Sequence, residues 1–189
     1  FIERSNDNEN TSWNEATISN DQIDFNYTID KQTIGIIGTR PEGFDTCDYD
    51  QDEVTNKLNV SLINLELDDL FDEAKNVNTE TIVTTKKTIS GYLQGTEDLV
   101  QDEFDKSISI YHGLESLKDK HNLDAFAIRC WPETFTEYGC ASCGPMAMMN
   151  EKKVSCACEA DVLGGISCNI LNQMNDNPSL LVDIVDVDK

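Results

Sequence analysis

Basic residues are scarce in this chain of 189 residues. Lysine and arginine total 14 against 36 aspartates and glutamates, which gives a formal net charge of −22. Such a chain repels both a nucleic-acid backbone and an anionic membrane surface, so we expect neither as a partner. A neutral ligand, a cation or a basic protein fits the charge better, although much of the acid serves only to keep the surface hydrated.

Long apolar runs and phosphate-binding glycine patterns are also missing. Hydrophobic residues make up 39% of the chain, and no apolar run approaches the length of a membrane span. No dinucleotide fingerprint follows the first predicted strand, and the glycines of 139–145 lack the spacing of a phosphate loop, so nucleotide binding is unsupported. The chain begins at Phe1 without a signal-like segment. We therefore expect a soluble, cytoplasmic protein.

The seven cysteines do not form the pattern of a disulfide-bonded secreted domain. Their number is odd and most lie between 130 and 168, which favours a reducing cytoplasm. Two close pairs, Cys140 with Cys143 and Cys156 with Cys158, suggest zinc or an iron–sulfur cluster. The second pair lies in a predicted buried strand, where alternate side chains favour core packing. A metal protein with cysteine ligands stays an alternative.

Strand and helix patterns alternate along residues 33–189. The predicted strands cover 33–38, 60–65, 125–131, 154–158 and 180–185, and the predicted helices cover 50–58, 68–74, 98–121, 146–150 and 162–174. Asp68 or Asp69 is the expected cap of the second helix. This alternation predicts an α/β fold with a doubly wound, mostly parallel, Rossmann-like sheet and helices on both faces. Residues 1–32, rich in Asn, Asp, Ser and Thr, are expected to be an irregular lead-in or linker.

Acidic residues lie at the ends of two neighbouring predicted strands. Glu159 directly follows the strand 154–158, and Asp183 lies within the strand 180–185, one crossover further along the chain. Both carboxylates are therefore expected to converge at the carboxyl edge of the sheet. An acid inside an apolar run needs a partner, which a divalent metal would supply. The alternative is an ordinary helix cap or a contact with a loop amide.

Four short motifs resemble the L-fucose/L-arabinose isomerase family, in the order that the family has them. They are residues 34–44 (Ile-Gly-Ile-Ile-Gly-Thr-Arg-Pro-Glu-Gly-Phe), Cys130–Glu133, Cys158–Asp161 with the glycines that follow, and Leu181–Asp183. The resemblance covers about residues 33–189. It implies that this segment is the central α/β domain of a larger isomerase-like protein with further N- and C-terminal domains.

The resemblance implies a metal-dependent aldose–ketose isomerase that uses Mn²⁺ or another divalent ion. Glu159 and Asp183 would be metal ligands and the two proton-transfer bases. Trp131, Glu133 and Asp161 would line the sugar site, with Asp161 supporting Glu159 rather than binding metal. Enzymes of that family often have Gln at the position of Trp131. The contact that this Gln makes with the substrate is therefore not carried over to this chain.

In the L-fucose/L-arabinose isomerase family, the third metal ligand is a histidine in a C-terminal domain. Neither His112 nor His121 matches it, because both lie on the predicted helix 98–121. We therefore expect weak or no activity from this chain alone, a small-molecule sugar as ligand, and a homo-oligomer or an assembly with the missing domains. A noncatalytic sugar-binding or regulatory module is the alternative from another functional class.

Overall fold

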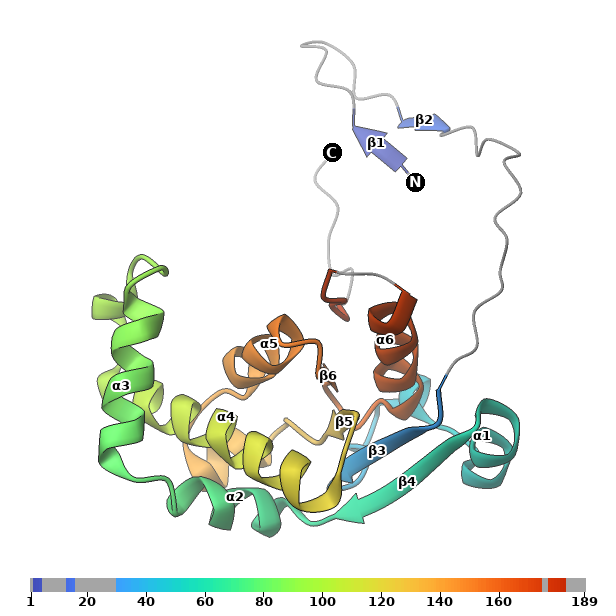
Figure 1. Ribbon diagram of the computed structural model, residues 1–189, viewed down its shortest axis with the longest axis horizontal. Helices are drawn as coiled ribbons and strands as arrows, with labels where there is room; N and C mark the ends of the chain where they lie inside the picture. Colours follow the sequence, from blue (N-terminus) through green and yellow to red (C-terminus); the bar gives the residue numbers. More distant parts are fainter. Residues whose placement is uncertain (1, 5–12, 16–29, 175–176, 183–189) are drawn as a thin grey trace.

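A four-stranded parallel sheet forms the centre of the computed structural model, which describes residues 2–4, 13–15, 30–174 and 177–182 (Figure 1). The strand order is β4-β3-β5-β6. The strands are β3 (Gln32–Ile37), β4 (Val60–Leu65), β5 (Ala125–Ile128) and β6 (Ser155–Ala157). Two short strands, β1 (Ile2–Arg4) and β2 (Trp13–Glu15), pair antiparallel within the segment expected to be irregular. The predicted α/β fold with a parallel sheet is confirmed.

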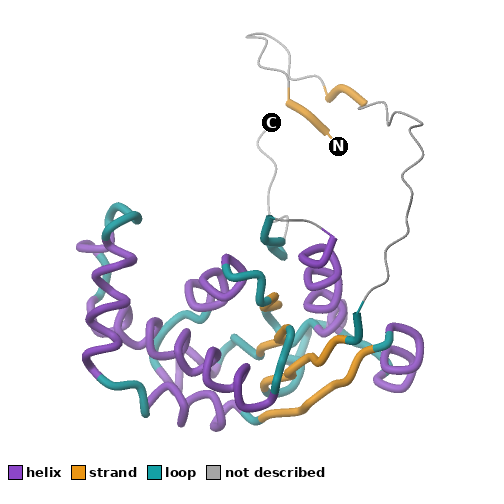
Figure 2. The backbone as a smooth tube through the Cα atoms, viewed as in Figure 1, coloured by secondary structure: helices purple, strands orange, loops and turns teal. Residues whose placement is uncertain are grey.

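Helices connect the strands of the sheet (Figure 2). They are η1 (Asp45–Cys47), α1 (Gln51–Leu58), α2 (Leu67–Lys75), α3 (Thr79–Ser90), η2 (Thr96–Asp98), α4 (Gln101–His121), the π-helical η3 (Thr134–Tyr138), α5 (Cys143–Glu151) and α6 (Val162–Met174). The cap predicted for α2 is wrong by two or three residues. Glu66 is the N-cap, and Asp69 accepts from the Glu66 N–H at 2.8 Å in a capping box.

The two faces of the sheet carry separate apolar cores, because successive strand side chains point to opposite faces. On one face Ile37, Phe126 and Ile128 pack with the buried residues of α2, α4 and α5. On the other face Ile36 and Ala127 pack with the buried residues of α1 and α6. The sheet is therefore the middle layer of three, as the doubly wound pattern predicted.

Helix α6 lies very close to β5, and Gly165 makes this approach possible. A Cβ atom at Gly165 would lie 3.0 Å from the carbonyl oxygen of Phe126, a backbone atom that cannot rotate away. The residue that begins α6, Val162, is fully buried. The glycine thus seats the amino end of α6 against the sheet and fixes the loop between β6 and α6.

Three further parts of the chain differ from the sequence prediction. Helix α3 was not predicted, because its Thr-rich, β-branched sequence has low helix propensity; packing on α4 stabilises it, and Thr85 Oγ1 lies 2.8 Å from His112 Nε2. Strand β5 ends at Ile128, three residues early. Residues 180–182 are not a strand: Ser179 N–H donates to Asn172 Oδ1 at 2.7 Å, which holds the chain at the end of α6.

Candidate functional site

The carboxyl ends of β3, β5 and β6 are held together beyond the last residue of each strand. Ile37 lies opposite Ile128 in the parallel register. The next peptide groups continue the ladder: Arg129 N–H donates to Ile37 O at 2.9 Å, and Ala160 N–H donates to Ile128 O at 3.0 Å. The strand order reverses between β3 and β5, which is the usual binding crevice of an open α/β sheet. The loops after these strands therefore share one edge.

Glu159 lies at this edge in an unusual backbone conformation. Glu159 and Ala160 have φ angles of 59° and 53°, the left-handed region that costs a residue with a Cβ about 1–2 kcal/mol. The thiol of Cys47, in η1, donates to Glu159 Oε2 over 4.0 Å. The carboxylate therefore faces the loop that follows β3. Strained backbone of this kind is frequent at functional sites, where the surrounding structure enforces it.

Asp161 caps helix α6. Its Oδ1 accepts from the Gly164 N–H at 2.8 Å, and its carbonyl accepts from the Gly165 N–H at 3.0 Å. A carboxylate at this position satisfies an otherwise unpaired amide and complements the positive end of the helix dipole. The contact supports the turn that presents Glu159. A direct contact of Asp161 with substrate stays a prediction.

Glu133 forms a two-pronged ion pair with Arg129, the first residue after β5. Arg129 Nε and Nη2 lie 2.7 Å from the two Glu133 carboxylate oxygens. Arg129 Nη1 also donates to the carbonyl of Thr39 at 3.2 Å. The guanidinium holds the pKa of the Glu133 carboxyl below its usual value. The pair thus ties the loop after β5 to the loop after β3, a role that the sequence did not suggest.

Trp131 presents its ring to solvent at the same edge. Its side chain is exposed, and its ring meets that of Phe135 edge-on with centroids 5.4 Å apart. The Trp131–Pro132 peptide bond is cis. An exposed aromatic face suits contact with the apolar face of a sugar ring, so the predicted sugar-lining role of Trp131 stays open.

The cysteines separate into core residues and residues of the sheet edge. Cys156 is buried in β6, and burial raises the pKa of its thiol, as expected for a core residue. A side-chain hydrogen bond with Cys158 lowers the pKa of the Cys130 thiol to about 7. Cys140 is buried whereas Cys143 is exposed. Across the described residues, no three His, Cys, Asp or Glu side chains are grouped to hold a metal.

The predicted second carboxylate, Asp183, lies outside the described residues. The structure therefore places Glu159 at the sheet edge and leaves its predicted partner unplaced. Carboxylate oxygens suit Mn²⁺ and other hard divalent ions, so the type of donor that Glu159 offers fits such an ion. Since the described part of the chain groups no three ligands, a metal held by Glu159 needs further ligands from elsewhere.

Besides Arg129, two further residues at this edge were not singled out in the sequence. Cys47 contacts Glu159, and Arg40, in the loop after β3, lies 2.8 Å from Asp45. The available signal was positional: Arg40 and Arg129 follow two strands of the same parallel sheet, so their loops had to meet. The contact of Cys47 had no such signal, because it depends on how η1 folds.

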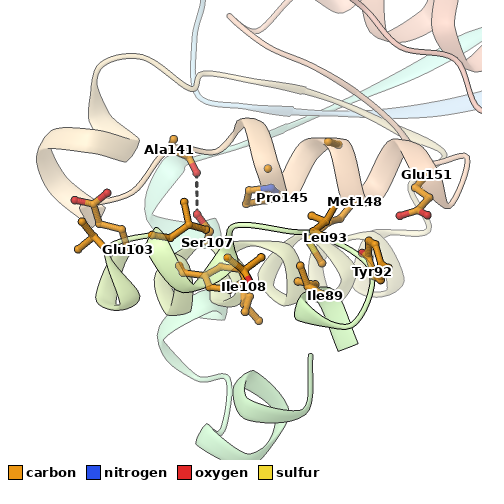
Figure 3. Close-up of a pocket in the computed structure, with 16 residues that line it drawn as sticks. Ile89, Tyr92, Leu93, Glu103, Ser107, Ile108, Ala141, Pro145, Met148 and Glu151 are labelled. Atoms are coloured by element: carbon orange, nitrogen blue, oxygen red, sulfur yellow. Dashed lines mark hydrogen bonds between the residues drawn. The ribbon is translucent and has the colours of Figure 1, made fainter. Parts of the chain in front are cut away.

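A large cavity of about 580 Å³ lies away from this edge, between α3, α4 and α5 (Figure 3). Apolar side chains dominate its wall, among them Ile89, Leu93, Ile108, Pro145 and Met148. A rare polar contact there joins Ser107 Oγ to the carbonyl of Ala141 at 3.1 Å. Its walls offer carboxylates of Glu103 and Glu151 but no grouped set of chemically active side chains, unlike the edge around Glu159.

None of the helices in the described residues is both long enough and apolar enough to cross a membrane. No protein-family model matches the chain.

The chain is similar to curated sulfoquinovose isomerases. It is 31% identical to that of Alkalicoccus urumqiensis over 144 residues, which cover 75% of this chain and 32% of the relative. It is 28% identical to that of Clostridium sp. (strain MSTE9) over 153 residues, 81% of this chain and 34% of the relative. It is 28% identical to that of Priestia aryabhattai over 163 residues, which cover 82% of this chain and 35% of the relative.

These relatives are sugar isomerases, which agrees with the broad class that the motifs indicated; none carries the name of a fucose or arabinose isomerase. The chain spans about a third of the length of the relatives that it matches. Most of this chain is thus similar to one part of a sugar isomerase.

Proposed function

We propose that this chain is the part of an aldose–ketose isomerase that carries the proton-transfer carboxylate Glu159. The observation that supports this most is the placement of Glu159: a strained turn at the carboxyl end of β6 directs it to the crevice, in a chain similar to sulfoquinovose isomerases. Sulfoquinovose is accordingly the first substrate to test. L-Fucose and L-arabinose, suggested by the motifs, come next.

In the proposed reaction Glu159 and Asp183 act on the open-chain sugar as a pair of bases. One carboxylate removes the proton from C2 of the aldose, which gives an enediolate, and a proton returns to C1 as the O2 proton moves to O1. No atom is gained or lost, so the product is the ketose. The Cys47 thiol, which donates to Glu159 Oε2, stabilises the carboxylate in its basic form.

A divalent ion would supply charge stabilisation in this reaction. Glu159 and Asp183 would hold it, and when bound it would stabilise negative charge on O1 and O2 of the sugar. Calorimetric titration of Mn²⁺ into the chain and into Glu159→Gln and Asp183→Asn tests this pair. Weaker binding in both variants supports the assignment, whereas equal binding in all three rejects it.

Isomerisation in D₂O tests the function of the full-length gene product. We expect conversion of sulfoquinovose to its ketose in the presence of Mn²⁺, with solvent deuterium entering at C1 or C2, followed by NMR. Glu159→Gln should slow both conversion and deuterium incorporation about 10²- to 10⁴-fold, while the thermal unfolding temperature stays close to that of the wild type. Binding of the sugar without any conversion would instead make the protein a noncatalytic sugar-binding module.

A further inference from the structure

The cations of this acidic chain are distributed unevenly over the fold. Every described lysine lies within a helix or just ahead of a strand. Arginine is different: of the three in the chain, Arg40 follows β3 and Arg129 follows β5. Those strands are neighbours at the centre of the sheet. Arg40 and Arg129 thus lie in the loops at the carboxyl edge of the sheet, on the same edge as the candidate catalytic carboxylate.

Arg129 is already engaged as a structural clamp. Its Nε and Nη2 hold the Glu133 carboxylate and its Nη1 holds the Thr39 carbonyl. The Thr39 carbonyl belongs to the peptide bond that joins Thr39 to Arg40. Gly38 lets the clamp close, because a Cβ at Gly38 would lie 3.0 Å from Arg129 Cβ. Arg129 therefore fixes the backbone from which Arg40 projects, while its own charge is neutralised.

Arg40, in contrast, has partners that a ligand can replace. Its Nη1 lies 2.8 Å from Asp45 and its Nε 3.9 Å from Asp48, and these two carboxylates are 92% and 75% exposed. Ion pairs with such exposed groups contribute little, because water screens them. No hydrogen bond joins Arg40 Nη2 to any residue that the structure describes. The guanidinium can therefore exchange a carboxylate for another oxyanion at small cost.

One short turn joins Arg40 to the candidate catalytic carboxylate. Helix η1 contributes Asp45, which pairs with Arg40, and Cys47, which contacts Glu159 Oε2. A sugar whose carbonyl end lies at Glu159 therefore has Arg40 along the same edge of the sheet. Two N–H groups of a guanidinium can donate side by side to two oxygens of a tetrahedral oxyanion.

We propose that Arg40 binds an anionic group of the substrate, a sulfonate on the sugar carbon farthest from the carbonyl. This assignment rests on the isomerase function proposed above and narrows its substrate class to sulfonated sugars. A net charge of −22 repels such an anion from most of the surface. Arg40 supplies the local positive charge that the sulfonate needs, and the sulfonate takes the place of Asp45 on the guanidinium.

The test compares sulfoquinovose with quinovose, the same sugar without the sulfonate, in steady-state kinetics of the full-length protein. Quinovose is measured as a substrate or, where it is not converted, as a competitive inhibitor. Arg40→Gln should lower kcat/KM for sulfoquinovose about 10- to 100-fold, the range for one charge-assisted hydrogen bond, and leave quinovose unchanged. Lys57→Gln, which removes a charge from an exposed pair on α1, should change neither.

Asp45→Asn separates anion binding from a structural role of the Arg40–Asp45 pair. Loss of the competing carboxylate should lower KM for sulfoquinovose, the opposite of Arg40→Gln, whereas a structural pair would make both variants lose activity on both sugars. Equal losses on the two sugars, or matching effects of the two variants, overturn the Arg40 assignment alone. A wild-type protein that converts L-fucose or L-arabinose but not sulfoquinovose overturns the Arg40 assignment alone. One that converts none of sulfoquinovose, quinovose, L-fucose and L-arabinose overturns the isomerase function and this assignment with it.

Discussion

The sheet edge around Glu159 and the cavity between α3, α4 and α5 differ in kind. The edge brings together carboxylate, guanidinium and thiol groups from the loops after three strands, and part of its backbone is strained. The cavity is spacious, but its walls are mainly apolar (Figure 3). Figure 1 places α3, which contributes to the cavity, at the opposite end of the molecule from α1. Open volume and chemical capability are therefore separated in this fold.

Replacement of one glutamate in each region gives the largest expected contrast. Glu159→Gln removes a proton-transfer base and should lower kcat of the full-length protein about 10²- to 10⁴-fold. Glu151→Gln, at the wall of the cavity, makes the same chemical change and should leave kcat unchanged. Turnover of sulfoquinovose by both variants checks this. Similar losses of kcat at the two positions would contradict the functional difference between the two regions.

The Arg129–Glu133 clamp should be a strong polar contributor to the sheet edge. Arg129→Met and Glu133→Gln each remove a partly buried charge from its partner. A double-mutant cycle by urea unfolding should give a coupling of about 1–3 kcal/mol, the range for hydrogen bonds between charged groups. Additive effects of the two substitutions would show that Glu133 does not hold the Arg129 guanidinium in place.

Two glycine-to-alanine variants should shift stability in opposite directions. Gly165→Ala pushes a Cβ against the Phe126 carbonyl and should cost about 1–3 kcal/mol of unfolding free energy. Gly144→Ala, in α5 at the cavity, meets no atom within 4 Å and should stabilise the helix by up to about 1 kcal/mol. Urea unfolding measures both. A destabilised Gly144→Ala would mean that the cavity wall is closely packed.

The smallest expected effect is the pH dependence of stability that comes from the ion pair between Glu115, in α4, and Lys152, at the end of α5. Burial raises the pKa of the Glu115 carboxyl, but hydrogen bonds from Lys152 and Tyr111 outweigh this effect and leave the pKa below its ordinary value. The Glu115–Lys152 ion pair therefore stabilises the fold above the ordinary pKa of a glutamate, about 4.3, and this stabilisation is lost as the pH falls through the lowered pKa. The unfolding free energy of the wild type should exceed that of Lys152→Met by only about 0–1 kcal/mol at pH 7, because Lys152 is largely exposed.

Urea unfolding of the wild type and Lys152→Met at pH 7 and at pH 3 measures this difference. The two proteins should become more alike at pH 3. A gap that stays constant with pH would assign the effect to the packing of Lys152 on the Tyr111 ring rather than to the ion pair.

Much of the fold was readable from local patterns, and the site only in part. Helix α6 and strand β4 match their predicted bounds, because apolar periodicity and neighbouring turn residues act locally. The position of Glu159 followed from its place after β6. Its contact with Cys47 did not, since that depends on two loops separated by over a hundred residues. Helix α3 was missed because tertiary packing outweighs its low propensity.

The left-handed backbone at Glu159 sets stability and function against each other in evolution. Glycine or asparagine adopts such a conformation more easily than glutamate, so either would relieve strain at this position. A library of position-159 variants sorted for folding alone should become enriched in these two residues. The same library sorted for turnover should return to glutamate. A homologue with glycine here would thus have gained a more stable fold by giving up the chemistry.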